Sequence, residues 1–98
     1  MSVFNTRDKV MSISRAEFDM SLGKFATGAT LDAEGIVRLP AGAGIATIRF
    51  SPLGPLTIGT ALIRLPRARV TLSFDGASVA DEAQFMRRFE IAFQRGGG

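Results

Sequence analysis

The chain has 98 residues, of which twelve are Lys or Arg and nine are Asp or Glu, giving a formal net charge of +3. This length suits one domain with a single hydrophobic core. His, Cys, Tyr and Trp are all absent. Their absence removes Ser-His-Asp and Cys-His catalysis, disulfides and the usual transition-metal ligands from the chain's own chemistry. We therefore expect a protein that is not an enzyme and that needs no cofactor or metal.

The sequence shows no leader peptide and no membrane-spanning segment. Residues 1–14 are charged and lack the apolar centre of a secretory signal. The longest apolar stretch, residues 53–65, contains Pro55 and Gly59 and falls short of the roughly 20 residues that a spanning helix needs. We expect a cytoplasmic protein without membrane contact.

The first half of the chain leaves one element open between strand and helix. Residues 1–10 are polar and aperiodic, and they predict a loose N-terminal arm. Phe18, Met20 and Leu22 alternate with polar residues, a pattern that favours a half-buried strand. A helix is the alternative, because Ser14 and Glu17 have the spacing of a capping box.

The middle of the chain is expected to form β-structure. Turn signals rich in Gly and Pro separate its apolar segments, and the clearest of these segments alternates Ala68, Val70, Leu72 and Phe74 with polar residues. Loops are expected at residues 32–35, 41–44 and 51–55, and Pro66 is expected to end the strand before it. The predicted strands are residues 29–31, 36–39, 45–50, 56–65 and 67–75.

Residues 78–95 are expected to form the main helix. Ser78 is a suitable N-cap, acidic residues follow in the first turn, and Phe85, Phe89 and Phe93 recur every four residues. A last strand over residues 89–93 is the competing interpretation. Residues 96–98 are three glycines and are expected to be a disordered tail.

These elements predict an α+β domain, mainly β, over residues 11–95. The expected architecture is an antiparallel sheet or small barrel of about five to seven strands with one C-terminal helix. The segment 56–65 is apolar on both alternating faces, which a compact monomer of this size would struggle to hide. We therefore expect a homo-oligomer, most simply a two-fold dimer.

The arginines are the most chemically suggestive feature, since Arg accounts for ten of the twelve basic residues. The candidate anion or nucleic-acid face comprises Arg49, Arg64, Arg67 and Arg69, with Arg38 joining if its strand is adjacent. Such a face binds phosphates by charge neutralisation. Sheet modules that bind nucleic acid also present aromatics for base stacking, whereas Thr71 and Ser73 follow these arginines. A solvated sheet face is the simpler interpretation.

Other candidate sites have simpler structural explanations. The stripe of Phe85, Phe89 and Phe93 would suit a partner-binding helix, but we favour packing in the core. The acidic pairs Asp32/Glu34 and Asp81/Glu82 fall where a turn and a helix start favour acids for local reasons. The glycines of residues 41–44 predict a hairpin loop rather than a phosphate cradle, because a strand follows them.

The missing catalytic residue types and the excess apolar surface favour a non-catalytic binding or assembly module that acts through protein–protein contacts. Three alternatives remain open at this point. One is anion or nucleic-acid binding through the Arg-rich sheet face. Another is an enzyme whose site uses only Asp, Glu, Arg, Ser or backbone groups. The third is a carrier of small apolar ligands, with Phe and Met side chains lining the interior of a barrel.

Overall fold

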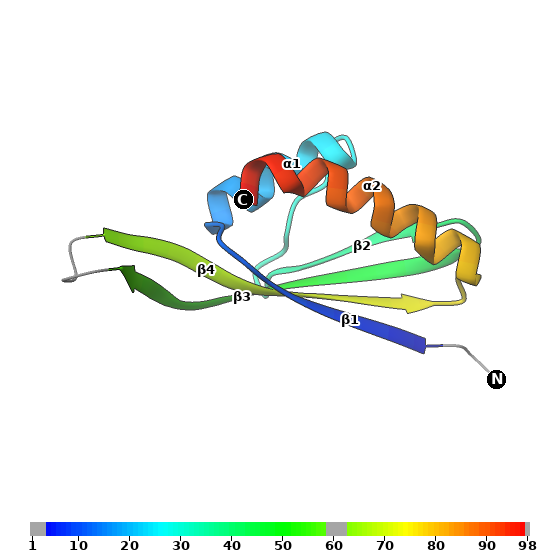
Figure 1. Ribbon diagram of the computed structural model, residues 1–98. Coiled ribbons are helices and arrows are strands. Elements are labelled where there is room, and N and C mark those ends of the chain that lie inside the picture. The colour runs from blue at the N-terminus through cyan, green and yellow to red at the C-terminus, as the bar shows by residue number, and fades with distance from the viewer. Residues whose placement is uncertain (1–3, 59–62, 98) are drawn as a thin grey trace.

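A computed structural model shows an open four-stranded antiparallel sheet with two helices on one of its faces (Figure 1). It describes residues 4–58 and 63–97, and for residues 4–5, 55–58, 63–64 and 94–97 it describes the backbone alone. The elements in chain order are β1 (Phe4–Met11), α1 (Arg15–Phe25), β2 (Ile36–Ala41), β3 (Gly44–Ile58), β4 (Ile63–Asp75) and α2 (Val79–Gly97).

The strand order is β1-β4-β3-β2, so the N-terminal strand lies beside the last one. The expected α+β class is confirmed, with β-structure prominent. The described strands form neither a closed barrel nor a sheet of five to seven strands. The difference arises because segments expected to be separate strands are merged into long ones or belong to a helix.

Helix α1 replaces the strand that the alternation of Phe18, Met20 and Leu22 favoured. Ser14 Oγ accepts a hydrogen bond from the Glu17 amide at 3.2 Å, and Glu17 Oε1 accepts one from the Ser14 amide at 3.0 Å. This capping box satisfies two amides at the start of the helix. Phe18 and Leu22, one helical turn apart, are fully buried, whereas Met20 is 65% exposed. Helical packing therefore outweighs the apparent two-residue period.

Residues 4–11 were expected to belong to a loose arm, apart from Met11, but they form the edge strand β1. Eight consecutive residues of β1 pair with β4, from Phe4 opposite Asp75 to Met11 opposite Ala68. The local sequence did not reveal this strand because its helix-facing positions carry charge. Arg7 lies opposite Leu72 and Lys9 opposite Val70, and both side chains reach carboxylates on α2 from the edge of the sheet.

The strands β2 and β3 form a tight hairpin around Gly42 and Ala43. Pro40, which comes directly after the predicted strand 36–39, lies within β2, where an edge strand tolerates a missing amide donor. Residues 29–31 do not form the strand that was predicted for them, whereas the turn predicted after them at residues 32–35 is confirmed. Gly35 has a φ of 79°, a backbone conformation that residues with a side chain rarely adopt. An added Cβ would also lie 2.6 Å from the Phe50 carbonyl oxygen, so both the backbone conformation and the close contact require glycine.

The predicted strand at residues 56–65 is divided between two strands, because β3 ends at Ile58 and β4 begins at Ile63. Strand β3 continues through the predicted turn at 51–55, with a shift in register between Leu53 and Leu56. It then pairs with β4 as far as Ile58 opposite Ile63, and β4 in turn runs through Pro66. A glycine inside an apolar strand segment also predicts a β-bulge at Gly59, but this position lies outside the described residues. In Figure 1 this two-stranded ribbon extends past the helices.

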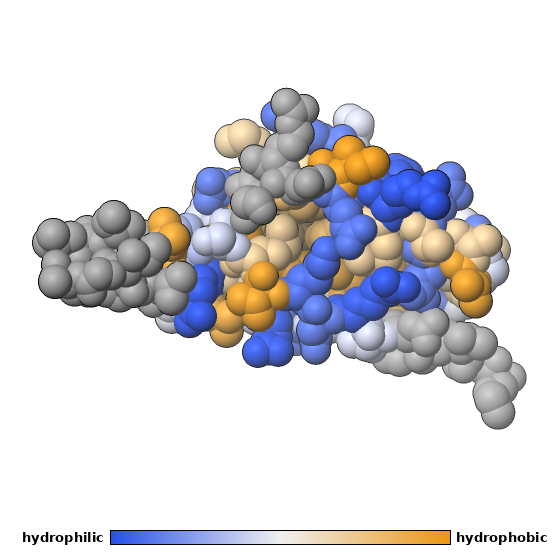
Figure 2. All heavy atoms as spheres, in the orientation of Figure 1, coloured by the Kyte–Doolittle hydropathy of each residue, from blue (hydrophilic) through white to orange (hydrophobic). Residues whose placement is uncertain are grey.

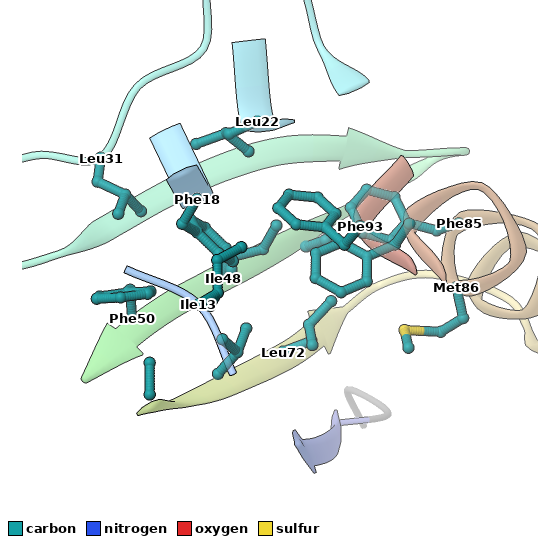
Figure 3. Close-up of a cluster of buried hydrophobic side chains, with 14 of the residues drawn as sticks. Ile13, Phe18, Leu22, Leu31, Ile48, Phe50, Leu72, Phe85, Met86 and Phe93 are labelled. Carbon is teal, nitrogen blue, oxygen red and sulfur yellow. The ribbon is translucent and has the colours of Figure 1, made fainter. Parts of the chain in front are cut away.

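The hydrophobic core lies between the sheet and the two helices. Ile48 and Phe50 of β3 and Leu72 of β4 point toward Phe18 of α1 and Phe93 of α2 (Figure 3). The ring centroid of Phe18 lies 5.0 Å from that of Phe50 and 4.7 Å from that of Phe93. Tilted ring contacts at these separations stabilise the core in addition to the burial of apolar area.

Helix α2 confirms the helix expected near residues 78–95 and excludes the final strand at 89–93. It runs on through Gly96 and Gly97, where a tail was expected. Phe85, Phe89 and Phe93 are 1–3% exposed, so the core interpretation of this stripe is confirmed. Among the described residues, neither helix has the length and hydropathy that a membrane span requires.

Candidate functional site

The two faces of the sheet differ in what covers them. The register places Ala46, Ile48, Val70 and Leu72 under the helices, and all four are fully buried. The alternate residues point to the other side, which neither helix covers in Figure 1. We call this side the open face. Its positions on the four strands are Thr6, Asp8, Val10, Ile36, Arg38, Pro40, Ile45, Thr47, Arg49, Ser51, Leu53, Arg67, Arg69, Thr71, Ser73 and Asp75.

Three exposed arginines from three neighbouring strands lie on one diagonal of the open face. Arg38 of β2 stands opposite Thr47, which is two residues before Arg49 on β3. Arg49 stands opposite Thr71, which is two residues after Arg69 on β4. Each arginine is therefore the diagonal neighbour of the next, and the Cα atoms of two such neighbours lie roughly 7–8 Å apart. We call Arg38, Arg49 and Arg69 the arginine diagonal.

The guanidinium groups of the arginine diagonal have no ion-pair partner among the described carboxylates. Among the described residues, the ion pairs involve Arg7 and Lys9, which face the helices from β1, and Arg15, which lies in α1. Because an exposed guanidinium keeps its charge at every physiological pH, the diagonal is a line of three positive charges available to a ligand.

The other predicted site residues take different positions. Arg67, two residues before Arg69 on β4, also lies on the open face, but its Nε donates a hydrogen bond to the Gly54 carbonyl oxygen at 3.0 Å. Arg64 pairs with Thr57 in the ribbon, and its side chain lies outside the description. Of the four arginines predicted to share a face, Arg49, Arg67 and Arg69 are brought together. Arg38 joins them because β2 lies next to β3.

The immediate neighbours of the diagonal are hydroxyl and aliphatic side chains. Thr47, Thr71 and Ser51 stand directly opposite the three arginines, and Ile36 and Val10 flank the line on the outer strands. Hydroxyls donate hydrogen bonds to phosphate oxygens. Aliphatic neighbours supply no ring for base stacking. This arrangement suits an anion held by charge and hydrogen bonds.

Two carboxylates limit the positive character of the open face. Asp75 lies on β4 six residues from Arg69, at the end of the sheet away from the ribbon. Asp8 stands opposite Thr71 and accepts a hydrogen bond from its hydroxyl at 2.8 Å, which makes it the diagonal neighbour of Arg69. Sequence reasoning missed Asp8 because only the pairing of β1 with β4 places it there.

The charged residues of β1 show why the two sides of the sheet differ chemically. Arg7 Nη2 lies 2.7 Å from Glu82 Oε2, and Lys9 Nζ lies 2.9 Å from Glu90 Oε2. The Lys9 ammonium, through its hydrogen bond and its charge, lowers the pKa of Glu90. The basic residues of β1 are thus neutralised by α2, whereas those of the arginine diagonal are not.

The predicted acidic pairs have local structural roles. Asp32 Oδ1 accepts hydrogen bonds from the amides of Glu34 and Ile36, both at 2.9 Å, and so shapes the turn before β2. Asp81 lies in the first turn of α2 and Glu82 pairs with Arg7. Within the described part of the chain, no group of three or more acidic side chains is placed to hold a metal ion.

Comparison with family models, with curated proteins and with solved structures gives no match to this chain. Its function is therefore inferred from its own residues and geometry.

Proposed function

We propose that this protein is a non-catalytic binding module that holds anionic partners on the open face of its sheet. The observation that carries the proposal is the arginine diagonal, three exposed guanidinium groups on one uncovered face without a described carboxylate partner. Uncompensated charge of one sign on a surface attracts ligands of the other sign and raises their local concentration.

The edges of the sheet are less suited to binding than its open face. Strand β2 is short and contains Pro40, and β1 carries Arg7, Asp8 and Lys9. Short length, proline and charge are the features by which edge strands resist pairing with another strand. Figure 2 shows that surface hydrophobic residues on the viewed side form separate patches among hydrophilic ones, which argues against one large apolar docking site there.

Heparin, a dense polyanion, provides a direct test. We expect the protein to be retained on immobilised heparin at low salt and to be eluted by moderate salt, because the contacts are electrostatic. The variant Arg49→Ala/Arg69→Ala removes two charges of the diagonal and is expected to elute near the void volume.

The matched control is Lys24→Ala/Arg87→Ala, which lowers the net charge equally but at exposed helix positions. We expect this control to elute close to the wild type. If both double variants lose retention to the same degree, the attraction is a property of net charge, and the open face is not the binding site.

A second candidate function is self-assembly, and the ribbon of β3 and β4 favours it. Its strands pair out to Ile58 and Ile63 beyond the helix layer, and residues 53–65 are largely apolar. Self-association through the open face would bring two arginine diagonals together, so a dimer built on the ribbon is preferred. Sedimentation equilibrium should give twice the chain mass. A monomer at every accessible concentration would contradict assembly.

A further inference from the structure

We infer that the anion bound by the arginine diagonal is double-helical nucleic acid, contacted through the phosphates of one strand and without base readout. This inference rests on the proposed function, since it names the ligand of the same surface. It follows from the length of the diagonal, its single-file arrangement and the side chains around it.

The length of the diagonal matches a short run of backbone phosphates. Two diagonal steps from Arg38 through Arg49 to Arg69 span roughly 15 Å. One strand of a duplex places a phosphate about every 3.4 Å along the helix axis, so this span corresponds to about four phosphate intervals measured along that axis. Because the arginines form one line across three β-strands, they fit one phosphate row rather than two.

The neighbours of the diagonal favour a duplex over a single strand. Proteins bind single strands largely by stacking bases on aromatic rings, but none of the residues paired with the arginines is aromatic. These residues are Thr47, Thr71, Ser51, Ile36 and Val10. The hydroxyls of Thr47 and Ser51 can donate to phosphate oxygens that the arginines leave free, whereas the Thr71 hydroxyl already donates to Asp8. A duplex keeps its bases stacked internally and offers a pre-ordered row of phosphates, so phosphate contacts alone suffice.

Contact with phosphates alone predicts binding that is independent of sequence and strongly dependent on salt. Three neutralised phosphates give a slope of log K against log salt of about −2.7 for duplex DNA. Removing two arginines should reduce the slope to about −0.9. Different base sequences should bind with equal affinity, because nothing in this geometry reaches a base edge.

The test is fluorescence anisotropy with a labelled DNA duplex of mixed sequence and with the single strand from it, over a series of salt concentrations. We expect the wild type to bind the duplex more tightly than the single strand, with the slope given above. Arg49→Ala/Arg69→Ala should lose about tenfold or more of the affinity at low salt. Lys24→Ala/Arg87→Ala should bind like the wild type.

A variant that is expected to bind the duplex more tightly complements the arginine variants, because misfolding can lower the affinity but would not raise it. Asp8 is the diagonal neighbour of Arg69, and Asp8→Asn removes its charge while keeping an oxygen that can accept the Thr71 hydroxyl. We expect roughly twofold to fivefold tighter duplex binding at low salt, because a phosphate beside Arg69 no longer meets a carboxylate. Unchanged or weaker binding would place the phosphates elsewhere.

The outcomes separate this inference from the proposed function. Retention on heparin through the diagonal without duplex binding overturns the inference and leaves the anion-binding function intact. Tighter binding to the single strand than to the duplex also overturns the inference. Loss of both heparin retention and duplex binding overturns the two together.

Discussion

The two faces of β4 show how one strand serves two purposes. Val70 and Leu72 lie under the helices and are fully buried, whereas Arg69, which directly precedes Val70, is exposed on the open face. On the covered face, side chains are fixed by apolar contacts, and the charges at its edge are paired with α2. On the open face, three arginines have no described ion-pair partner. The covered side of the sheet therefore holds the hydrophobic core, and the open side carries the proposed binding surface.

The largest effect is expected from a truncation on the covered face. Phe18 is fully buried and contacts the rings of Phe50 and Phe93. Phe18→Ala should lower the free energy of unfolding by about 3–5 kcal/mol, through lost burial and the cavity that remains. Chemical denaturation measures this change. The control Met20→Ala lies on the exposed side of the same helix and should change stability by less than about 0.5 kcal/mol.

A smaller effect is expected at the edge of the covered face. Glu82 is 6% exposed and accepts a hydrogen bond from Arg7 Nε at 2.8 Å. Glu82→Gln should destabilise the protein by about 1–3 kcal/mol, because it weakens a charge-assisted bond in a mostly buried place. In the exposed pair of Lys9 with Glu90, Glu90→Gln should cost at most about 1 kcal/mol. Equal losses in the two variants would show that burial does not distinguish the pairs.

The capping box of α1 makes a pH-dependent contribution. The backbone amide and the hydroxyl of Ser14 hydrogen-bond to Glu17 and lower the pKa of its carboxyl from 4.5. Because the folded state favours the ionised form, this contribution is complete above pH 4.5 and is lost as the pH falls through the lowered pKa. The stability difference between the wild type and Glu17→Gln should therefore shrink on acidification. A difference that grows toward acid pH would contradict this sign.

The smallest effect on stability is expected on the open face. Arg49 and Arg69 are exposed and form no ion pair with described residues. The double variant Arg49→Ala/Arg69→Ala should unfold within about 0.5 kcal/mol of the wild type, even though it loses heparin retention. Thermal unfolding followed by circular dichroism measures the first quantity. A large loss of stability would mean that these arginines support the fold, and the division between the two faces would fail.

Local sequence predicted the elements whose periodicity and end signals agree. The strand at residues 67–75 is correct because its alternating residues meet both the core and solvent as expected. Helix α2 is correct because Phe85, Phe89 and Phe93 repeat at helical spacing behind an acidic first turn. The buried role of these phenylalanines and the exposed role of Arg69 followed from the same patterns.

Only the tertiary structure decided the elements in which local signals disagree. The segment containing Phe18, Met20 and Leu22 fits both periods, and the capping box with the packing of Phe18 against two other elements makes it a helix. Strand β1 has no apolar alternation, because Arg7 and Lys9 take helix-facing positions that α2 neutralises across more than 70 residues of sequence.

The sequence by itself determined that the basic residues are mostly arginines and that those of β4 alternate with core residues. The order β1-β4-β3-β2 and its register decided that Arg38, Arg49 and Arg69 form one line and that Asp8 lies beside it. The physical reason is that strand pairing is a long-range choice made by hydrogen bonds and burial across the whole sheet. No short stretch of sequence contains that information.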